Sequence, residues 1–320
     1  MPERAAARPA AMPRGGPSGG RGHDLLVGLA AALSITVFVR APWTFFAADD
    51  IVHLSRAAGF LPWNGPYRPL TERLAYWIQF RLFGLDPIGY HLVNMSLHLA
   101  CVAGVYALGL RLTGSKGRAF ATAVLFGCAS IAFTPLYWAS GVIELATCAL
   151  LLAATLAHLA AARRGPSWRW LAALLGLGAM LSKETALAWP LWIAWIEWRA
   201  DTPGTTPRAR LRALLPSAAA AATFLAALAA YGHFVRLRDS AAYAIDPSVG
   251  TVLLNLLTYL GWATARWEAI PDRVAAIDPG AWPIGLALLA ASLLVLRVVP
   301  AAARRVAAAG MGASSSAKST

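Results

Sequence analysis

The stretch that decides the fold is LLVGLAAALSITVFVRAPWTFFAADD, which runs from Leu25 to Asp50. Its first part, Leu25 to Phe46, is an apolar run of about 22 residues, long enough for a helix to cross the hydrocarbon core of a bilayer. A signal peptide has a shorter apolar core, and no small-residue cleavage site precedes the two aspartates. The stretch therefore predicts a first membrane span followed by a pair of carboxylates.

The composition of the whole chain agrees with a membrane-embedded protein. Of its 320 residues, 58% are apolar and only 13% are charged, whereas soluble domains carry about 25% charged residues. This composition excludes an ordinary soluble enzyme, a disordered chain and a small disulfide scaffold. Further spans are expected at 88–110, 119–138, 142–162, 169–182, 185–198, 211–231 and 282–299. Together these runs predict an all-α polytopic membrane protein with about eight transmembrane helices.

We expect a single transmembrane domain over residues 24–300. The segments 1–23 and 301–320 are rich in small residues and are expected to be disordered tails, the first of them cytoplasmic. Two longer connections on the outer side are expected at 47–86 and 232–281.

The first outer loop contains its own helical pattern. From Arg68 onward, apolar residues recur at helical spacing, at Leu70, Leu74, Trp77 and Ile78. This pattern predicts an amphipathic helix over 68–84 that lies in the membrane interface, with a short soluble helix as the alternative. The aromatic residues expected to face the interface are Trp63, Tyr76 and Trp77.

The net charge of +13 is better explained by membrane topology than by nucleic acid. The cations lie between apolar runs, where they orient helices and meet anionic lipid headgroups, and no basic run with interleaved aromatics forms a continuous patch. We therefore expect no nucleic-acid partner, a location in the cell inner (plasma) membrane and a cytoplasmic amino terminus. The stretch 249–265 is expected to lie along the outer surface, and a further span there is the alternative.

Two adjacent carboxylates, Asp49 and Asp50, follow the first span. They are candidate catalytic residues because mutual repulsion can raise the pKa of one of them, making it a proton acceptor. The alternative is a solvated cap on a helix that begins near Ile51. His53 lies four residues after Asp49, so a divalent metal on this pair is a second alternative. We expect no cofactor and no metal.

Several other polar residues interrupt apolar sequence and are expected on the same outer face. Arg68 is a candidate phosphate-binding cation because its planar fork of donors suits phosphate, with snorkelling to lipid headgroups as the alternative. Lys183 interrupts a pair of apolar runs, and an ion pair with Glu184 is the alternative to a functional role. Ionisable and polar residues within membrane helices often line a functional cavity, although hydrogen bonding between helices explains them equally well. The candidate substrate-cavity residues are His53, His91, Asn94, Glu144 and Glu184.

These pieces, taken in order, resemble the GT-C superfamily of polytopic membrane glycosyltransferases. The likeness is to the protein mannosyltransferase family and to the tetratricopeptide-linked transmembrane mannosyltransferases, and it covers about residues 25–200. The matching stretches are Asp49-Asp50, Tyr67-Arg68-Pro69-Leu70-Thr71, Leu82-Phe83-Gly84-Leu85-Asp86-Pro87, Gly89-Tyr90-His91-Leu92-Val93-Asn94 with His98, and Leu181-Ser182-Lys183-Glu184-Thr185-Ala186.

The resemblance implies transfer of a sugar from a polyprenyl-phosphate carrier to an acceptor hydroxyl on the non-cytoplasmic face. It implies that Asp49 is the base, that Asp50 is its neighbour, and that Arg68 and Lys183 bind the donor phosphate. The acceptor that it implies is a glycan, lipid or protein. Family members are usually longer, so a shortened enzyme, a half that needs a partner and an inactive relative all remain open. The alternative from a different class is a non-catalytic membrane protein, either a subunit of a lipid or polysaccharide transporter or an assembly factor.

Overall fold

The described part of the chain is a bundle of α-helices. The computed structural model describes residues 18–63, 68–199, 206–231, 248–265 and 282–291, and none of these residues lies in a β-strand. The longer helices are α1 (Ser18–Val37), α4 (Pro87–Thr113), α5 (Lys116–Gly127), α7 (Val142–Arg164), α8 (Ser167–Ser182), α10 (Pro207–Ala230) and α12 (Val249–Ala265).

Shorter elements connect the longer ones. The short α-helices are α2 (Ala48–Ala57), α3 (Tyr76–Phe83), α6 (Phe133–Tyr137), α9 (Trp189–Arg199) and an apolar helix at Trp282–Ala291. The 3-10 turns are η1 (Ala41–Trp43), η3 (Ser130–Ala132), η4 (Ala139–Gly141) and η5 (Glu184–Ala188), and a π-helical segment, η2, covers Pro69–Ala75.

Within the described residues, helices of membrane-spanning length and composition are Gly22–Trp43, Pro87–Thr113, Ala139–Arg164 and Pro207–Ala230. A fifth candidate combines α5 with Ser130–Tyr137, at a bend of 48°. These helices confirm the prediction of an all-α, multi-pass membrane protein.

The remaining predicted spans are shorter or lie partly outside the described residues. α8 and α9 form the predicted short pair at 169–182 and 185–198. Of the predicted span at 282–299, the structure describes only 282–291. The tail at 301–320 and most of the loop at 232–281 also lie outside the described residues, and α1 begins at Ser18, inside the segment expected to be a tail.

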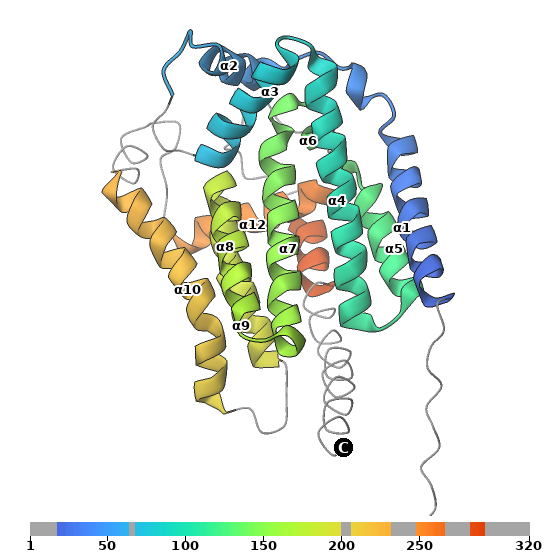
Figure 1. Cartoon of the computed structure of the whole chain (residues 1–320), viewed down its shortest axis with the longest axis vertical. Helices are drawn as coiled ribbons and strands as arrows, with labels where there is room; N and C mark the ends of the chain where they lie inside the picture. The colour runs from blue at the N-terminus through green and yellow to red at the C-terminus, as the bar shows by residue number, and fades with distance from the viewer. Residues whose placement is uncertain (1–17, 64–67, 200–205, 232–247, 266–281, 292–320) are drawn as a thin grey trace, which may run out of the picture.

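One end of the bundle gathers segments that are far apart in the sequence. α4 and α7 both begin there, and α2 and α3 lie across it (Figure 1). α8 returns to the same end, where the Thr71 hydroxyl donates a hydrogen bond to the carbonyl of Ser182 at 2.7 Å. The loop after the first span is therefore attached to the tip of the α8–α9 pair.

Small residues allow α7 and α8 to pack closely. Ala154 and Ala157 of α7 lie in one buried cluster with Ala172 and Ala179 of α8. Small side chains let helix backbones approach, which favours van der Waals contact between membrane helices.

A helical segment forms over the stretch predicted to be an interfacial helix, and its polarity is arranged differently from that of a helix packed on a protein core. Its first part is the π-helical η2 and its second part is α3. The buried residues are Thr71, Glu72, Tyr76 and Gln79, whereas Leu74, Trp77, Ile78 and Leu82 are exposed. The apolar face therefore points away from the bundle, as an interfacial helix requires. The prediction was wrong for Tyr76, which is fully buried rather than facing the interface.

Residues 129–141, here called the wall segment, connect α5 to α7 by short turns instead of one straight helix. The Asn94 side-chain amide holds it by donating to the carbonyls of Trp138 at 2.8 Å, Pro135 at 3.2 Å and Ala139 at 3.3 Å. Irregular backbone at membrane depth is tolerated where protein groups satisfy its hydrogen bonds. Asn94 thus stabilises the break.

Gly141 is expected to be essential to the wall segment because a side chain there would overlap the backbone carbonyl of Pro135. The Gly141→Ala variant should lower the free energy of unfolding by roughly 1–3 kcal/mol, the usual cost of overpacking. Thermal unfolding of the purified protein in detergent measures this. The matched control is Gly117→Ala in α5, where no atom lies within 4 Å of the added carbon. Equal stability of the two variants would contradict the prediction.

Candidate functional site

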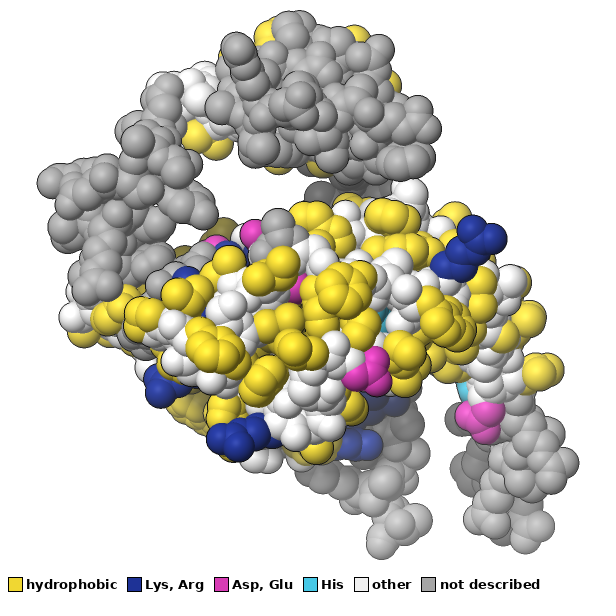
Figure 2. Space-filling model, turned by 90° about the horizontal axis from the view of Figure 1, so that it is seen from above, with side chains coloured by type: hydrophobic (Ala, Val, Ile, Leu, Met, Phe, Trp, Pro, Cys, Tyr) yellow, Lys and Arg dark blue, Asp and Glu magenta, His cyan; other side chains and the backbone are white. Residues whose placement is uncertain are grey.

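A cavity of about 580 Å³ opens at the end of the bundle that carries α2. Its polar lining includes Asp49, His53, Arg68, Ser140 and Glu144. The rest of the lining is largely apolar and comes from the wall segment, α5 and α7: Phe126, Ile131, Ala132, Pro135, Trp138, Ile143, Leu145 and Cys148. Seen from this end, the surface carries a few acidic and basic side chains among apolar ones (Figure 2). The cavity therefore joins a charged region to an apolar one.

The two aspartates have different environments. Asp50 is completely buried, and its carboxylate accepts four hydrogen bonds. The donors are the backbone N–H groups of Ala47 (2.8 Å), Ala139 (3.2 Å) and Ser140 (2.6 Å) and the hydroxyl of Tyr76 (3.2 Å). Asp49 is exposed and lines the cavity. Asp50 thus anchors α2 to the wall segment, and Asp49 is left available to a ligand.

Burial sets the protonation of two rings beside this anchor. It raises the pKa of Tyr76 well above its ordinary value, with the charge of Asp50 adding to the effect, so Tyr76 stays a hydrogen-bond donor. Burial also lowers the pKa of His53, and the Arg56 cation lowers it further. His53 is therefore neutral at pH 7, and its ring lies 4.7 Å from that of Tyr76 between centroids.

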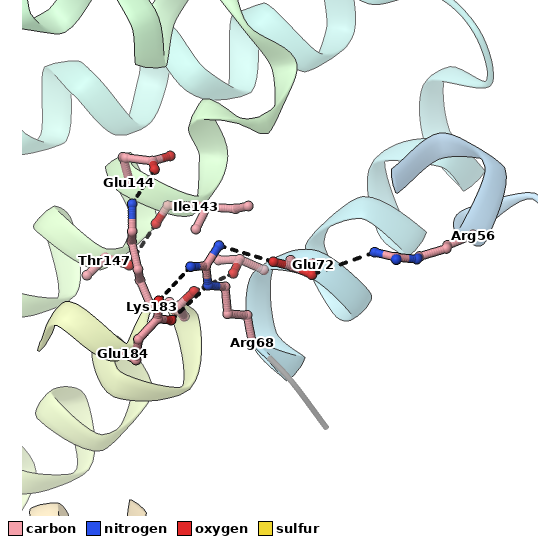
Figure 3. Close-up of polar contacts among 10 residues, drawn as sticks. Arg56, Arg68, Glu72, Ile143, Glu144, Thr147, Lys183 and Glu184 are labelled. Atoms are coloured by element: carbon pink, nitrogen blue, oxygen red, sulfur yellow. Dashed lines mark hydrogen bonds and ion pairs between the residues drawn. The ribbon is translucent and has the colours of Figure 1, made fainter. Parts of the chain in front are cut away.

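Arg68 is held in place by two carboxylates from different elements. It donates to Glu184 through Nε at 2.9 Å and Nη2 at 2.6 Å, and to Glu72 through Nη1 at 3.2 Å (Figure 3). Glu72 also pairs with Arg56, whose Nη1 lies 3.9 Å from Glu72 Oε2. Burial raises the pKa of Glu72, although the charges of Arg56 and Arg68 act to lower it. Arg68 has a φ of 44°, a left-handed conformation that costs of order 1–3 kcal/mol in a residue other than glycine. Contacts on both sides thus fix the guanidinium.

Lys183 follows α8 and reaches a second carboxylate. Its Nζ donates to Glu144 Oε1 at 2.5 Å, and both side chains are partly exposed. Because Glu144 lines the cavity beside Arg68 and Asp49, the residues predicted as base and cations gather at one end of the bundle. The two pairs also come close in Figure 3, where Glu144–Lys183 lies next to Glu184–Arg68.

His91 and Asn94 lie behind the wall segment and do not line the cavity. His91 contacts the carbonyl of Leu136 at 3.0 Å and the hydroxyl of Thr44 at 3.1 Å, and both His91 and Asn94 are fully buried. Their contacts support the cavity wall. His98, which belongs to the same polar stripe, does line the cavity.

Sequence reasoning missed the roles of Glu72, Tyr76 and the N–H of Ser140. Glu72 stands four residues after Arg68, a spacing typical of helical ion pairs, so this partner was detectable. The other two groups meet Asp50 through contacts that no local pattern reveals. Among the described side chains, no three His, Cys, Asp or Glu residues come together as metal ligands.

Comparison with known proteins finds one distant similarity. The chain is 31% identical over 128 residues to Protein O-mannosyl-transferase Tmtc1 of Drosophila melanogaster, which is 39% of this chain and 14% of that protein. The chain thus spans about a seventh of the length of the curated relative it matches. No protein-family model matches the chain, and no solved structure matches it significantly. The similarity supports a distant, mannosyltransferase-like relationship.

The different environments of the two aspartates predict different effects on stability. Asp50→Asn should lower the free energy of unfolding by about 2 kcal/mol, because an amide cannot accept all the backbone N–H bonds that the buried carboxylate now accepts. Asp49→Asn should leave stability unchanged, since Asp49 is exposed. Thermal unfolding of both variants in the same detergent compares them. If both variants unfolded like the unaltered protein, Asp50 would not be the anchor.

Proposed function

We propose that the protein is a glycosyltransferase that moves a sugar from a polyprenyl-phosphate carrier to an acceptor hydroxyl on the non-cytoplasmic face of the membrane. The observation that carries this proposal is the cavity in which exposed Asp49 faces the same space as Arg68 and Glu144. The similarity to a protein O-mannosyl-transferase supports the general reaction class.

In the proposed reaction, a carboxylate oxygen of Asp49 takes the proton of the acceptor hydroxyl. The hydroxyl oxygen forms a bond to the anomeric carbon of the sugar, on the side opposite the phosphate. The bond between that carbon and the phosphate oxygen breaks at the same time, and its electron pair leaves with the polyprenyl phosphate. The sugar is thereby transferred with inversion of configuration.

Arg68 and Lys183 are the proposed partners of the leaving phosphate. The planar fork that Arg68 presents to the Glu184 carboxylate also matches two oxygens of a phosphate. Lys183 adds a second positive charge next to the cavity through its pair with Glu144. Cations placed before the substrate binds stabilise negative charge as it develops on the phosphate.

The apolar part of the cavity supports a lipid-linked donor. Its lining from the wall segment includes Trp138 and Ile131, which are also exposed at the surface of the bundle. A polyprenyl chain is hydrocarbon, so it gains free energy by lying against apolar side chains and membrane lipids. The acceptor in this proposal is a hydroxyl of a glycan, lipid or protein.

The distribution of charge supports placing the cavity outside the cytoplasm. Arg111, Arg163 and Arg164 lie in the last turns of α4 and α7, at the end opposite the one where both helices meet α2 and α3 (Figure 1). Cytoplasmic ends of membrane helices are enriched in such cations. We therefore propose an inner-membrane protein with a cytoplasmic amino terminus. The proposal includes no metal or cofactor.

One observation favours the non-catalytic alternative. Both proposed phosphate-binding cations already contact carboxylates, an arrangement that also suits a purely structural network in a transporter subunit or assembly factor. This alternative predicts that purified protein never releases polyprenyl phosphate from a sugar donor.

The Asp49→Asn variant should lower sugar transfer at least 100-fold, because a positioned general base typically contributes 10²–10⁴-fold. The assay incubates purified protein with polyprenyl-phosphate mannose, glucose or N-acetylglucosamine and with peptide, glycan or lipid hydroxyls. It then measures the polyprenyl phosphate released.

The control for this assay is Asp24→Asn, which removes an exposed carboxylate in the first turns of α1. It should retain full activity. An Asp49→Asn protein that transfers sugar at the original rate would remove Asp49 from the mechanism, and no release by the unaltered protein with any donor would favour the non-catalytic alternative.

A further inference from the structure

Among the described residues, none hydrogen-bonds the ring of His53, whereas the rings of the other buried histidines near the cavity each have at least one partner, although Nδ1 of His98 has none. Both ring nitrogens of His91 have partners, and Nε2 of His98 contacts Ser34 and Gly127 at 2.9 and 3.0 Å. His53 is only 8% exposed, yet none of the described residues bonds to its ring. Its Nδ1 is a buried, unsatisfied atom.

An unsatisfied buried polar group is costly and therefore uncommon in a native protein. His53 also lines the cavity, so a molecule in the cavity can supply the missing partner. The ring is held on one side by Tyr76, which the bond to Asp50 in turn fixes at 3.2 Å. The imidazole is thus oriented by packing while its hydrogen-bonding capacity is unused.

The position of His53 relates it to the proposed base. It follows Asp49 by four residues in α2, so the two side chains lie on the same face of the helix and line the same cavity. In the proposed reaction, the acceptor hydroxyl that meets Asp49 attacks the anomeric carbon of the sugar, so the transferred sugar lies next to Asp49 and within reach of His53.

The neutral state of the His53 ring indicates which kind of ligand group it can bind. Burial and Arg56 lower the pKa of the ring, which favours the neutral imidazole. A neutral imidazole offers one donor and one acceptor, which suits a sugar hydroxyl, whereas a phosphate oxygen needs the cations that Arg68 and Lys183 already provide.

We propose that His53 hydrogen-bonds a hydroxyl of the transferred sugar and so helps the protein to distinguish sugar-bearing polyprenyl phosphate from bare polyprenyl phosphate. This inference rests on the proposed function and assigns a substrate-contacting residue within the same site. A purely structural role of His53 would affect the binding of both lipids, whereas the proposed contact affects only the binding of the sugar-bearing lipid.

The test compares the full-length protein with its His53→Phe variant, which keeps a ring against Tyr76 but removes both nitrogens. Binding of polyprenyl-phosphate mannose, glucose, N-acetylglucosamine and bare polyprenyl phosphate is measured for each protein in nanodiscs. For the preferred sugar lipid, the variant should bind about tenfold more weakly, as expected for one hydrogen bond of typical strength. Its affinity for bare polyprenyl phosphate should be unchanged, and its thermal stability should be equal or higher because an unsatisfied polar group has been removed.

Two further variants make the result decisive. His53→Gln retains a donor and an acceptor and should recover part of the preference for the sugar lipid. Ser55→Ala changes a neighbouring residue of α2 that does not line the cavity, and should behave as the unaltered protein. If His53→Phe weakened both classes of lipid equally, or left the sugar preference intact, the inference would fail while the proposed function stood. If the unaltered protein preferred no sugar lipid to bare polyprenyl phosphate, the proposed function would fail and the inference with it.

Discussion

The buried carboxylate of Asp50 is the interaction on which the rest of the site depends. It accepts backbone N–H groups from the start of α2 and from two consecutive residues of η4. Those N–H groups lie at breaks between helices at one end of an apolar bundle, where a buried donor without a partner costs about 1–3 kcal/mol. By satisfying them, Asp50 holds α2 against the wall segment, and this contact determines where Asp49 and His53 lie.

A second constraint is charge balance next to the cavity. Arg56, Arg68 and Lys183 contact Glu72, Glu184 and Glu144. Isolated cations in a partly buried site would be expensive to desolvate, and the carboxylates offset that cost.

Much of the architecture was predictable because membrane helices need long apolar runs. The runs at 88–110, 142–162 and 211–231 became α4, α7 and α10, and polar residues as distant in sequence as Asp49 and Lys183 lie at one end of the bundle. The division of labour between Asp49 and Asp50 was not predictable. Neighbouring positions of a helix point in different directions, and which one is buried depends on N–H groups about ninety residues away. Tyr76 was misplaced for the same reason, since its partner is Asp50.

The apolar side chains of η2 and α3 that face away from the bundle suit a contact with membrane lipid. Leu74, Trp77 and Leu82 are exposed, which would be unfavourable in water but is favourable against lipid. The Arg81 guanidinium lies 5.5 Å from the centroid of the Trp77 ring, and such a pairing of aromatic ring and cation suits the boundary between acyl chains and headgroups. η2 is joined through Thr71 to the tip of α8. Under the proposed function, this link would hold the network of Arg68 and Lys183 near the lipid headgroups, where the phosphate of a lipid-linked donor would meet the cations while its hydrocarbon tail stays among the acyl chains.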